Sequence, residues 1–398
     1  METIAINGGE PVRKTKIYYG HQLIEEDDIR VVAKVLRSEY LTCGPAVEQM
    51  EQKLAAYTGA KYAVAVSNGT AALHCACMAA GIKKGDEVIT TPLTFAASAN
   101  CVLYCGGRPV FADIDPETYN IDPKSIEACI TEKTKAVIAV DFTGQVVKAR
   151  EIRAICDKYK LIFIEDAAHS IGTRYEDRMV GTLADMTTFS FHPVKTITAG
   201  EGGAVLTDNE ELYKKLVLAH AHGITHDENL MERSSYEGPW YYEEVALGYN
   251  YRLTDFQAAL LMNQLGKIDR FIARRREIVK IYDEALKRVS GIILQKEIKE
   301  SASCKHLYVI RLDPNKLTCT RRQFFNAMSA ENIQCQVHYI PVYWFSYYEQ
   351  LGYEKGLCPI AEKIYKGIMS IPLYPAMSDQ DVQDVIHGIN KIAKYYAR

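Results

Sequence analysis

The sequence predicts an α/β protein with a mainly parallel, seven-stranded sheet in a large N-terminal domain and a smaller α+β domain at the C-terminus. Short and almost wholly apolar runs recur through the first 210 residues, as expected for strands that are covered on both faces. Longer segments with helical patterns separate these runs, and this alternation is typical of a parallel sheet. After residue 267 the pattern changes to one long charged helix and shorter mixed elements, which indicates a second domain.

Seven strands and the helices between them account for the large domain. The run Tyr-Ala-Val-Ala-Val at 62–66 predicts a buried strand, and a helix at 70–80 follows it directly. Another clear helix is predicted at 148–159. We expect strands at residues 62–66, 87–91, 109–114, 136–142, 161–165, 187–191 and 203–206.

The C-terminal part starts with a long helical pattern at 268–289, whose Arg, Lys and Glu side chains are typical of a connector between domains. We expect the domains at 1–267 and 268–398, with the N-terminal segment, up to about residue 24, packed on the small domain. Strands are predicted at 306–312 and 334–338, and helices at 320–331, 359–368 and 378–396.

Composition excludes several classes of protein. The 398 residues are 48% hydrophobic and 24% charged, as in a globular protein. The 47 basic and 50 acidic side chains leave a net charge of −3, so no basic surplus indicates a nucleic-acid partner. No apolar run approaches the ~20 residues that cross a bilayer, and no secretory signal is evident. The eleven cysteines form no CxxC pair, and we expect reduced thiols in a cytoplasmic protein.

The first motif is Ser-Asn-Gly-Thr-Ala-Ala-Leu at 67–73, where a predicted strand is followed by a helix. Its small residues let the backbone approach a ligand, and the free N–H groups of the first helical turn favour an anion such as phosphate. The chain has no GxGxxG and no P-loop motif, so neither a dinucleotide nor a P-loop nucleotide is indicated. The alternative is a plain tight turn in which Thr70 caps the helix.

The second motif, Ile-Phe-Ile-Glu-Asp-Ala-Ala-His at 162–169, places Asp166 at the end of an apolar strand. In an open parallel sheet, ligands bind outside the carboxyl ends of the strands, so this carboxylate is expected in the ligand site. There it could hydrogen-bond a cationic ring nitrogen and keep that nitrogen protonated. The alternative is that Asp166 caps the turn that follows.

The third motif runs from Phe-Ser-Phe-His-Pro-Val-Lys at 189–195 to Gly-Glu-Gly-Gly at 200–203, and it places Lys195 in a loop just after a strand. A lone loop lysine is usually solvated. One that is held beside an aldehyde can form a Schiff base, and its freed amine can then move protons. Gly202 and Gly203 lead into the next apolar strand, as a close-packed turn requires.

These three motifs, in this order and at these spacings, resemble the sugar aminotransferases of the DegT/DnrJ/EryC1/StrS family, from about residue 18 to the C-terminus. The resemblance implies fold type I of the pyridoxal 5′-phosphate (PLP)-dependent transferases, with PLP as the cofactor. Lys195 would then bond the cofactor aldehyde, and Asp166 would pair with its ring nitrogen. The phosphate would be held by Gly69, Thr70 and Ser190.

The same resemblance implies further site residues. Phe95 matches the aromatic ring that stacks on the cofactor, and His169 matches the residue near its phenolic oxygen. In Leu-Gly-Tyr-Asn-Tyr-Arg-Leu at 247–253, Asn250 would reach the phosphate in the neighbouring subunit, and Arg252 would contact substrate. The active unit would therefore be a homodimer with shared active sites. From the residues alone, core packing for Phe95 and a plain surface loop at 247–253 are the alternatives.

The lysine loop and the segments 306–308 and 336–343 look most like the PseC branch of the family, which makes UDP-4-amino-4,6-dideoxy-N-acetyl-β-L-altrosamine for pseudaminic acid. This implies amino transfer from an amino acid, with L-glutamate expected, to the C4 keto group of a UDP-linked 4-keto-6-deoxy-HexNAc sugar. His338 is a candidate contact for the sugar nucleotide, and a structural histidine is the alternative. Aminotransferases for sugars of the 4-amino-4-deoxy-L-arabinose, bacillosamine or perosamine type are the other possibilities.

A PLP sugar dehydratase and a non-catalytic DegT-like regulatory protein are the alternatives to an aminotransferase. A PLP sugar dehydratase would replace the lysine, commonly by His. A non-catalytic DegT-like regulatory protein would be free to lose the lysine, the aspartate or the phosphate loop, and this chain keeps all three. His220, His222 and His226 have no carboxylate or thiolate placed to complete a metal site, so none is predicted. We expect an enzyme that binds a nucleotide sugar and an amino-acid donor and that has no membrane partner.

Overall fold

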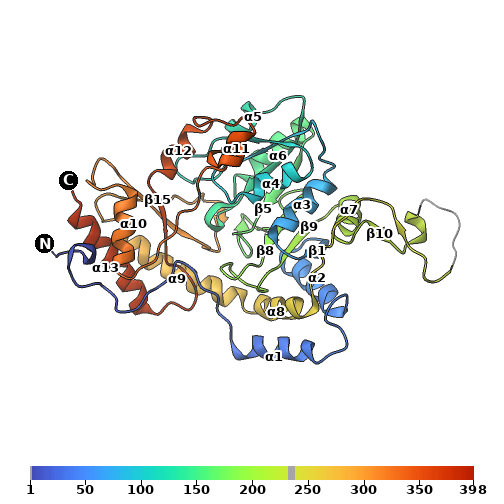
Figure 1. Ribbon diagram of the computed structural model, residues 1–398, viewed down its shortest axis with the longest axis horizontal. Helices are drawn as coiled ribbons and strands as arrows, with labels where there is room; N and C mark the ends of the chain where they lie inside the picture. The colour runs from blue at the N-terminus through green and yellow to red at the C-terminus, as the bar shows by residue number, and fades with distance from the viewer. Residues whose placement is uncertain (1, 232–237) are drawn as a thin grey trace.

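The computed structural model describes residues 2–231 and 238–398 (Figure 1). A sheet of seven strands forms its centre, in the order β1-β9-β8-β5-β4-β2-β3. Within this sheet β9 pairs antiparallel with both of its neighbours, and the other pairs are parallel. The predicted sheet is therefore confirmed. Its strands are β1 (Tyr62–Val66), β2 (Glu87–Thr90), β3 (Arg108–Phe111), β4 (Thr134–Val140), β5 (Ile162–Asp166), β8 (Met186–Ser190) and β9 (Gly203–Thr207).

Helices cover both faces of this sheet, because its strands are apolar on both sides. Val64 and Val66 of β1 enter the core that α3, α4 and α7 share, while Ala63 and Ala65 enter the core that α2, α5, α6 and α8 share. The helices predicted at 70–80 and 148–159 are present as α3 and α6. The covering helices are α2 (Pro45–Thr58), α3 (Gly69–Ala79), α4 (Ala97–Tyr104), α5 (Pro123–Ala128), α6 (Ala149–Tyr159), α7 (Glu210–His220) and α8 (Asp255–Leu265).

The C-terminal part is built on an antiparallel sheet of β12 (Ile292–Leu294), β14 (Tyr308–Leu312) and β15 (Ile368–Ile371). The strand predicted at 334–338 is wrong. Gln336 makes only an isolated bridge with Ser370, because the chain beyond it runs along a cavity instead of along β15. The helix predicted at 359–368 ends earlier than expected, because Ile368 is already the first residue of β15. The predicted helices are present as α10 (Arg321–Ala330), α12 (Pro359–Tyr365) and α13 (Asp379–Tyr395).

The N-terminal segment packs on this small sheet. Ile4 belongs to its core, and the Glu331 carboxylate accepts the backbone N–H groups of Ala5 at 2.8 Å and Val12 at 2.9 Å. Lys391 of α13 pairs with Glu331 at 3.1 Å, and both side chains are fully buried. A buried ion pair thus fastens the start of the chain to its end.

Helix α9 (Ile268–Leu286) belongs to both cores. Phe271 and Ile272, in its first half, pack into the core of the large sheet, whereas Val279 and Tyr282 pack into that of the small sheet. A helix that packs into the cores of both sheets in this way connects two domains. We propose the boundary just before this helix, at residues 267 and 268.

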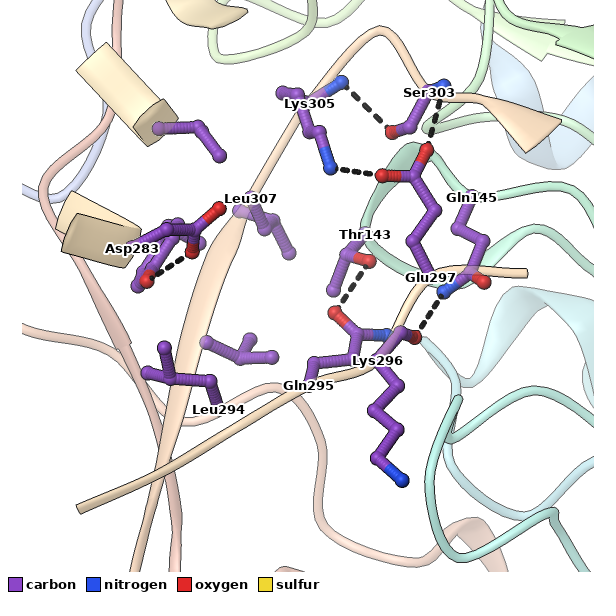
Figure 2. A pocket seen from close by; sticks show the side chains of 13 residues that line it. Thr143, Gln145, Asp283, Leu294, Gln295, Lys296, Glu297, Ser303, Lys305 and Leu307 are labelled. Carbon is purple, nitrogen blue, oxygen red and sulfur yellow. Dashed lines mark hydrogen bonds and ion pairs between the residues drawn. The ribbon is translucent and has the colours of Figure 1, made fainter. Parts of the chain in front are cut away.

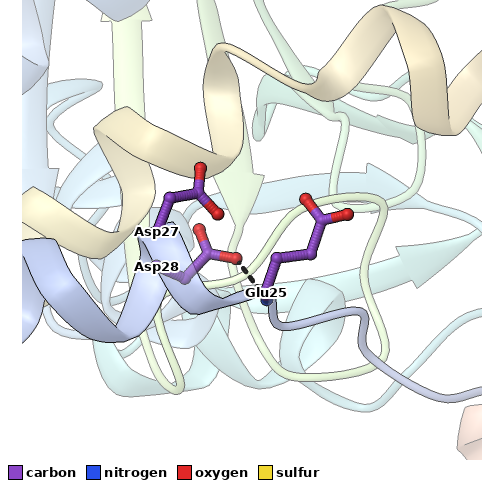
Figure 3. Close-up of side chains that lie close together, drawn as sticks. All are labelled: Glu25, Asp27 and Asp28. Atoms are coloured by element: carbon purple, nitrogen blue, oxygen red, sulfur yellow. Dashed lines mark hydrogen bonds between the residues drawn. The ribbon is translucent and has the colours of Figure 1, made fainter.

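Three carboxylates at the start of α1 (Glu26–Leu36) lie close together, those of Glu25, Asp27 and Asp28 (Figure 3). The Lys267 ammonium lies 3.0, 2.6 and 3.0 Å from their oxygens. Its hydrogen bond lowers the pKa of Asp27 to about 2. Arg270 adds a second positive charge 2.6 Å from Glu25. The lysine holds α1 against the chain between α8 and α9.

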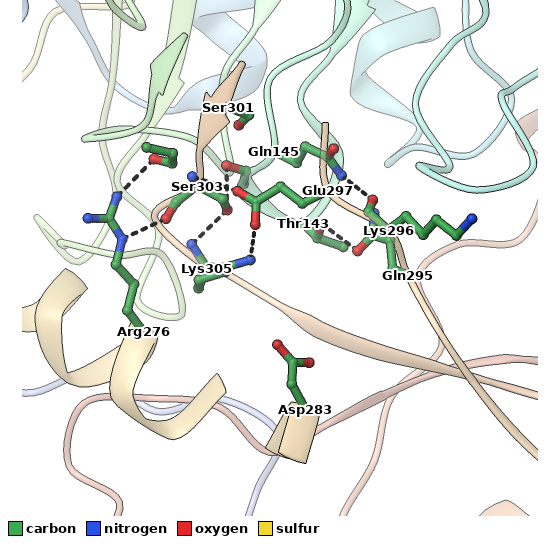
Figure 4. Close-up of polar contacts among 12 residues, drawn as sticks. Thr143, Gln145, Arg276, Asp283, Gln295, Lys296, Glu297, Ser301, Ser303 and Lys305 are labelled. Carbon is green, nitrogen blue, oxygen red and sulfur yellow. Dashed lines mark hydrogen bonds and ion pairs between the residues drawn. The ribbon is translucent and has the colours of Figure 1, made fainter. Parts of the chain in front are cut away.

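A polar junction joins the segment 295–305 to the loop that follows β4 (Figures 2 and 4). The Thr143 hydroxyl donates to the Gln295 side chain at 2.9 Å, and Lys305 pairs with Glu297. These groups line a cavity of about 160 Å³, and their polar atoms largely satisfy one another. The junction places the next residue of the chain, His306, beside the large sheet.

Short elements complete the described chain. An arm made of residues 221–231 and 238–250 includes β10 (Ile224–Thr225) and β11 (Glu243–Glu244), and it extends beyond α7 away from the rest of the molecule (Figure 1). Of the helices described, none is long and apolar enough to cross a membrane. The other short elements are β6 (Arg174–Tyr175), β7 (Arg178–Met179), β13 (Ser301–Ala302) and α11 (Ser346–Gln350).

Candidate active site

A cavity of about 960 Å³ lies at the carboxyl edge of the large sheet, where the last residues of β4, β5 and β8 line it. This is the edge at which the sheet rule places ligands. Eight of the ten site residues predicted from the sequence line this one cavity: Gly69, Thr70, Phe95, Asp166, His169, Ser190, Lys195 and His338.

The N-terminus of α3 forms one wall of the cavity. Asn68 caps this helix, since its side chain accepts the backbone N–H of Ala71 at 2.8 Å. The alternative in which Thr70 is the cap is therefore wrong, and Thr70 lines the cavity instead. A Cβ atom on Gly69 would lie 2.8 Å from the Cβ of Ser190, so only glycine lets α3 approach β8 this closely. The small side chains and free N–H groups there suit a phosphate.

Asp166 ends β5 and is almost fully buried. Its carboxylate accepts the Ser98 hydroxyl at 2.6 Å and the backbone N–H of Ala168 at 3.2 Å. The second hydrogen bond caps the turn after β5, which is the alternative role that the sequence suggests for Asp166. Asp166 therefore both caps this turn and lines the cavity. Burial raises the pKa of Asp166, whereas the Ser98 hydrogen bond and the positive Lys195 lower it. A cationic group in the cavity would stabilise this carboxylate further.

Lys195 lies in the loop between β8 and β9, where its backbone N–H donates to the His192 carbonyl at 2.9 Å. Burial lowers the pKa of the Lys195 amine to about 8, although the Asp166 carboxylate opposes this shift. An amine with this pKa is partly unprotonated near neutral pH. It is therefore able to attack an aldehyde under conditions where an ordinary lysine is almost wholly charged.

Three histidines, His169, His306 and His338, also line the cavity. Burial lowers the pKa of each imidazole, to about 3 for His338, and the nearby Lys195 adds to the effect. All three are therefore neutral at pH 7. His338 is held from outside the cavity, because its Nδ1 lies 2.7 Å from the Ser370 hydroxyl.

Sequence reasoning did not single out Ser98, the donor to Asp166, nor two residues from later in the chain, His306 and Tyr339. The Tyr339 hydroxyl lies 3.1 Å from Nε2 of His169. Both residues stand in the segments 306–308 and 336–343 that carry the resemblance to one branch of the family. That signal points to the segments, but it does not say which of their side chains meet the cavity.

Phe95 lies at the cavity with 64% of its surface exposed, so the alternative of plain core packing is excluded. Asn250 is exposed on the arm, and Arg252 is half-buried. Neither of these two lines the cavity of its own chain, whereas Tyr251 between them does. One chain therefore does not bring Asn250 and Arg252 together with Lys195.

The residues around the cavity fit PLP. Gly69, Thr70 and Ser190, which line one wall of the cavity, would hold its phosphate. The buried Asp166 carboxylate would face its ring nitrogen, and the Lys195 amine would bond its aldehyde carbon. Such a set at the carboxyl edge of a mainly parallel sheet is the arrangement of a PLP-dependent transferase of fold type I.

Comparison with known proteins supplies the family. The model of the DegT/DnrJ/EryC1/StrS aminotransferase family matches residues 22–390, and the chain belongs to this family. Spore coat polysaccharide biosynthesis protein SpsC of Bacillus subtilis is 43% identical over 378 residues, which are 94% of this chain and 97% of that protein. A Campylobacter jejuni UDP-4-amino-4,6-dideoxy-N-acetyl-β-L-altrosamine transaminase is 40% identical over 387 residues, covering 95% and 99%.

A solved structure agrees with this assignment. That of Helicobacter pylori PseC, an aminotransferase involved in the biosynthesis of pseudoaminic acid, matches with a TM-score of 0.89 at 31% identity, covering 96% of this chain and 100% of that one. The protein is accordingly a sugar aminotransferase with PLP as its cofactor. The predicted family, fold type and cofactor are confirmed.

Proposed function

We propose that this enzyme moves an amino group from L-glutamate to the C4 keto group of a UDP-linked 4-keto-6-deoxy-HexNAc sugar. The product would be UDP-4-amino-4,6-dideoxy-N-acetyl-β-L-altrosamine. The observation that carries the proposal is the shared cavity in which Lys195, Asp166 and the phosphate cradle face one space. The choice of sugar is supported by a relative of matching length that is named as this transaminase.

Lys195 is the residue that moves protons in this proposal. Its Nζ atom, with a pKa of about 8, takes a proton from Cα of the amino-acid donor and returns one at C4 of the sugar. The buried Asp166 carboxylate would hold the positive ring nitrogen of the cofactor, and Ser98 orients that carboxylate by its hydrogen bond. When bound, PLP supplies a ring that withdraws electrons from the reacting carbon.

The same proposal covers the partner subunit and the compartment. The exposed Asn250 would complete the phosphate site of a second copy of the chain, and Arg252 would contact substrate there. This is supported by their position outside the cavity of their own chain. A cytoplasmic enzyme is supported by the free state of all eleven cysteines.

An amination panel tests the proposal. The purified protein is supplied with PLP, L-glutamate, and UDP- and dTDP-linked keto sugars that differ at C3, C4 and C5. We expect an amino sugar, detected by mass spectrometry, from the UDP-linked 4-keto substrate, with 2-oxoglutarate formed in equal amount. A product aminated at C3, or products from dTDP sugars alone, would contradict the assigned substrate and leave the enzyme class intact.

A lysine variant tests the assigned chemistry in the same panel. Lys195→Ala should lower turnover by about a thousandfold or more, because both the covalent link and the proton carrier are lost. Lys214→Ala is the matched control, since Lys214 pairs with Glu210 on the surface of α7. Normal turnover in the Lys195 variant would refute the role of this residue.

A further inference from the structure

We propose that the hydrogen bond between His74 and Tyr251 fixes the base of the arm so that Asn250 is held toward the second copy of the chain. His74 and Tyr251 are then positioning residues for the phosphate site of the other protomer. The inference rests on the proposed function in one respect, the role of Asn250 at that phosphate. His74 itself lies in the middle of α3 and outside the cavity lining.

His74 is a buried polar side chain on a helix of small and apolar residues. Only 3% of its surface is exposed, and Leu73 and Cys75 beside it enter the core. A buried polar group is costly unless it is hydrogen-bonded. Nδ1 of His74 lies 3.1 Å from the Tyr251 hydroxyl. Burial lowers the pKa of His74 and raises that of Tyr251, so this bond joins two neutral groups at pH 7.

The rings around His74 show which way the base of the arm faces. Tyr249 and Tyr251 are stacked, with ring centroids 5.2 Å apart and an interplanar angle of 9°. Both also contact the His74 ring, at centroid distances of 4.9 and 5.9 Å. In an extended segment, side chains two positions apart share one side and the residue between them points to the other. Asn250 therefore points away from α3, and it is exposed.

Backbone hydrogen bonds hold the same segment along its edges. The N–H group of Tyr249 donates to the Ala219 carbonyl at 2.8 Å. That of Tyr251 donates to the His220 carbonyl at 2.9 Å, and the Tyr251 carbonyl accepts the N–H group of Ser67 at 2.6 Å. These bonds fix where the segment lies. The side-chain bond from α3 adds a hold on one face of the segment, and this determines which face is left for Asn250.

Helix α3 would thereby serve two phosphate sites. Its N-terminus, with Gly69 and Thr70, lines the cavity of its own chain. Its middle, through His74, holds the segment that carries Asn250. Without this bond the segment is free to turn about its backbone, and the Asn250 amide is no longer aimed at the second copy. The loss should therefore fall on the site of the other protomer and not on that of the altered one.

A dimer with a single working site tests where the loss falls. One full-length protomer carries Asn250→Ala and keeps Lys195, while the other carries Lys195→Ala and keeps Asn250. Two different affinity tags isolate the mixed dimer. PLP is titrated, trapped by borohydride, and measured by mass spectrometry as label on the one remaining Lys195. The PLP concentration at half-maximal labelling is the readout.

His74→Phe keeps a ring at this position and removes its nitrogens. In the protomer that supplies Asn250, it should raise the half-labelling concentration about tenfold, the low end of the effect of one lost hydrogen bond to a charged group. In the protomer that holds Lys195, it should change that concentration by less than about twofold. An equal effect in both positions, or an effect only in the Lys195 protomer, would overturn the proposal.

Tyr251→Phe removes the same bond from its other end. In the protomer that supplies Asn250 it should give the same shift as His74→Phe, and the two changes together should give no larger shift. Additive shifts would overturn the proposal. If His74→Phe does not fold, Tyr251→Phe decides alone, and an unchanged concentration would then overturn the proposal.

Tyr343→Phe in the same protomer is the matched control, because it removes a tyrosine hydroxyl that bonds Glu362 at 2.7 Å outside the cavity lining. It should leave the half-labelling concentration unchanged. The mixed dimer without these variants tests the proposed function itself. If it binds PLP no more tightly than the Asn250→Ala homodimer, the role of Asn250 is refuted and this inference with it. Tight binding that ignores both His74 and Tyr251 refutes this inference alone.

Discussion

At the scale of single residues, two opposing effects set the charge of Lys195. Burial removes water from the ammonium group and favours the neutral amine, while the negative Asp166 favours the charged form. Burial is the larger effect, and it lowers the pKa to about 8 from the ordinary 10.5. The amine therefore loses its proton about 2.5 pH units below the pH at which a solvated lysine does.

This environment predicts how cofactor capture depends on pH. Covalent trapping of PLP by borohydride should rise as the amine loses its proton, with a midpoint near pH 8 in the unaltered protein. In Asp166→Asn the carboxylate that raises the pKa of Lys195 is neutral, so the midpoint should move below 8. Glu201→Gln, which changes another carboxylate at the cavity, should leave the midpoint in place. A midpoint near 10.5 in the unaltered protein would contradict the argument.

At the scale of elements, the N-terminal segment and α13 are held together by a buried ion pair. Lys391 and Glu331 are each fully buried, and Lys391 also donates to the Glu10 carbonyl at 2.6 Å. Such a pair contributes little net stability when it is intact. Removing one partner is costly, because the other charge is left buried without its counter-ion.

Lys391→Met should therefore lower the free energy of unfolding by about 3 kcal/mol in chemical denaturation. Adding Glu331→Gln to this variant removes the buried carboxylate charge that has lost its counter-ion. The double variant, Lys391→Met with Glu331→Gln, should therefore be more stable than Lys391→Met alone. The exposed pair of Lys214 with Glu210 serves for comparison, since Lys214→Met should change stability by less than about 0.5 kcal/mol. An equal small effect at both lysines would show that burial of the pair has no energetic consequence.

At the scale of the whole molecule, the arm at 221–231 and 238–250 carries large side chains that stay exposed among the residues the structure describes. Trp240 is 71% exposed and Leu247 is 75% exposed. The base of the arm is closely packed, because a Cβ on Gly248 would lie 2.1 Å from the backbone nitrogen of Gly223. A firmly based arm with exposed apolar side chains suits contact with a second copy.

Mixing two inactive variants tests whether the sites are shared. Lys195→Ala and Asn250→Ala protomers, unfolded and refolded together, should regain about a quarter of the unaltered activity, because half of the dimers are mixed and each of these has one complete site. Mixing Lys195→Ala with Asp166→Asn should restore nothing, since both residues belong to the same side of the site. Recovery in neither mixture would contradict a site completed by Asn250 of a second copy.

The strands of the large sheet and the cavity lining were predictable because their signals are local. Apolar runs mark strands that are buried on both faces. Asp166 is the last residue of one such strand, and Lys195 lies in the loop after another. The strand predicted at 334–338 failed because its apolar pattern also suits an extended segment beside a cavity. Thr70 was the wrong choice for the cap because packing against β8 decides where the helix begins. Helix α3 begins at Gly69, so the residue before it, Asn68, is the cap.

By itself, the sequence determined the sheet, the family and the identity of the cofactor, because each depends on short stretches whose spacing is set by strand and helix geometry. Tertiary structure alone decided that Tyr339 meets His169 and that His306 faces the same ring. These contacts depend on how the segments at 306 and 339 are carried back against the large sheet. Local conformational preferences of the sequence do not determine these contacts, because contacts between side chains that are distant in the sequence depend on how whole elements pack.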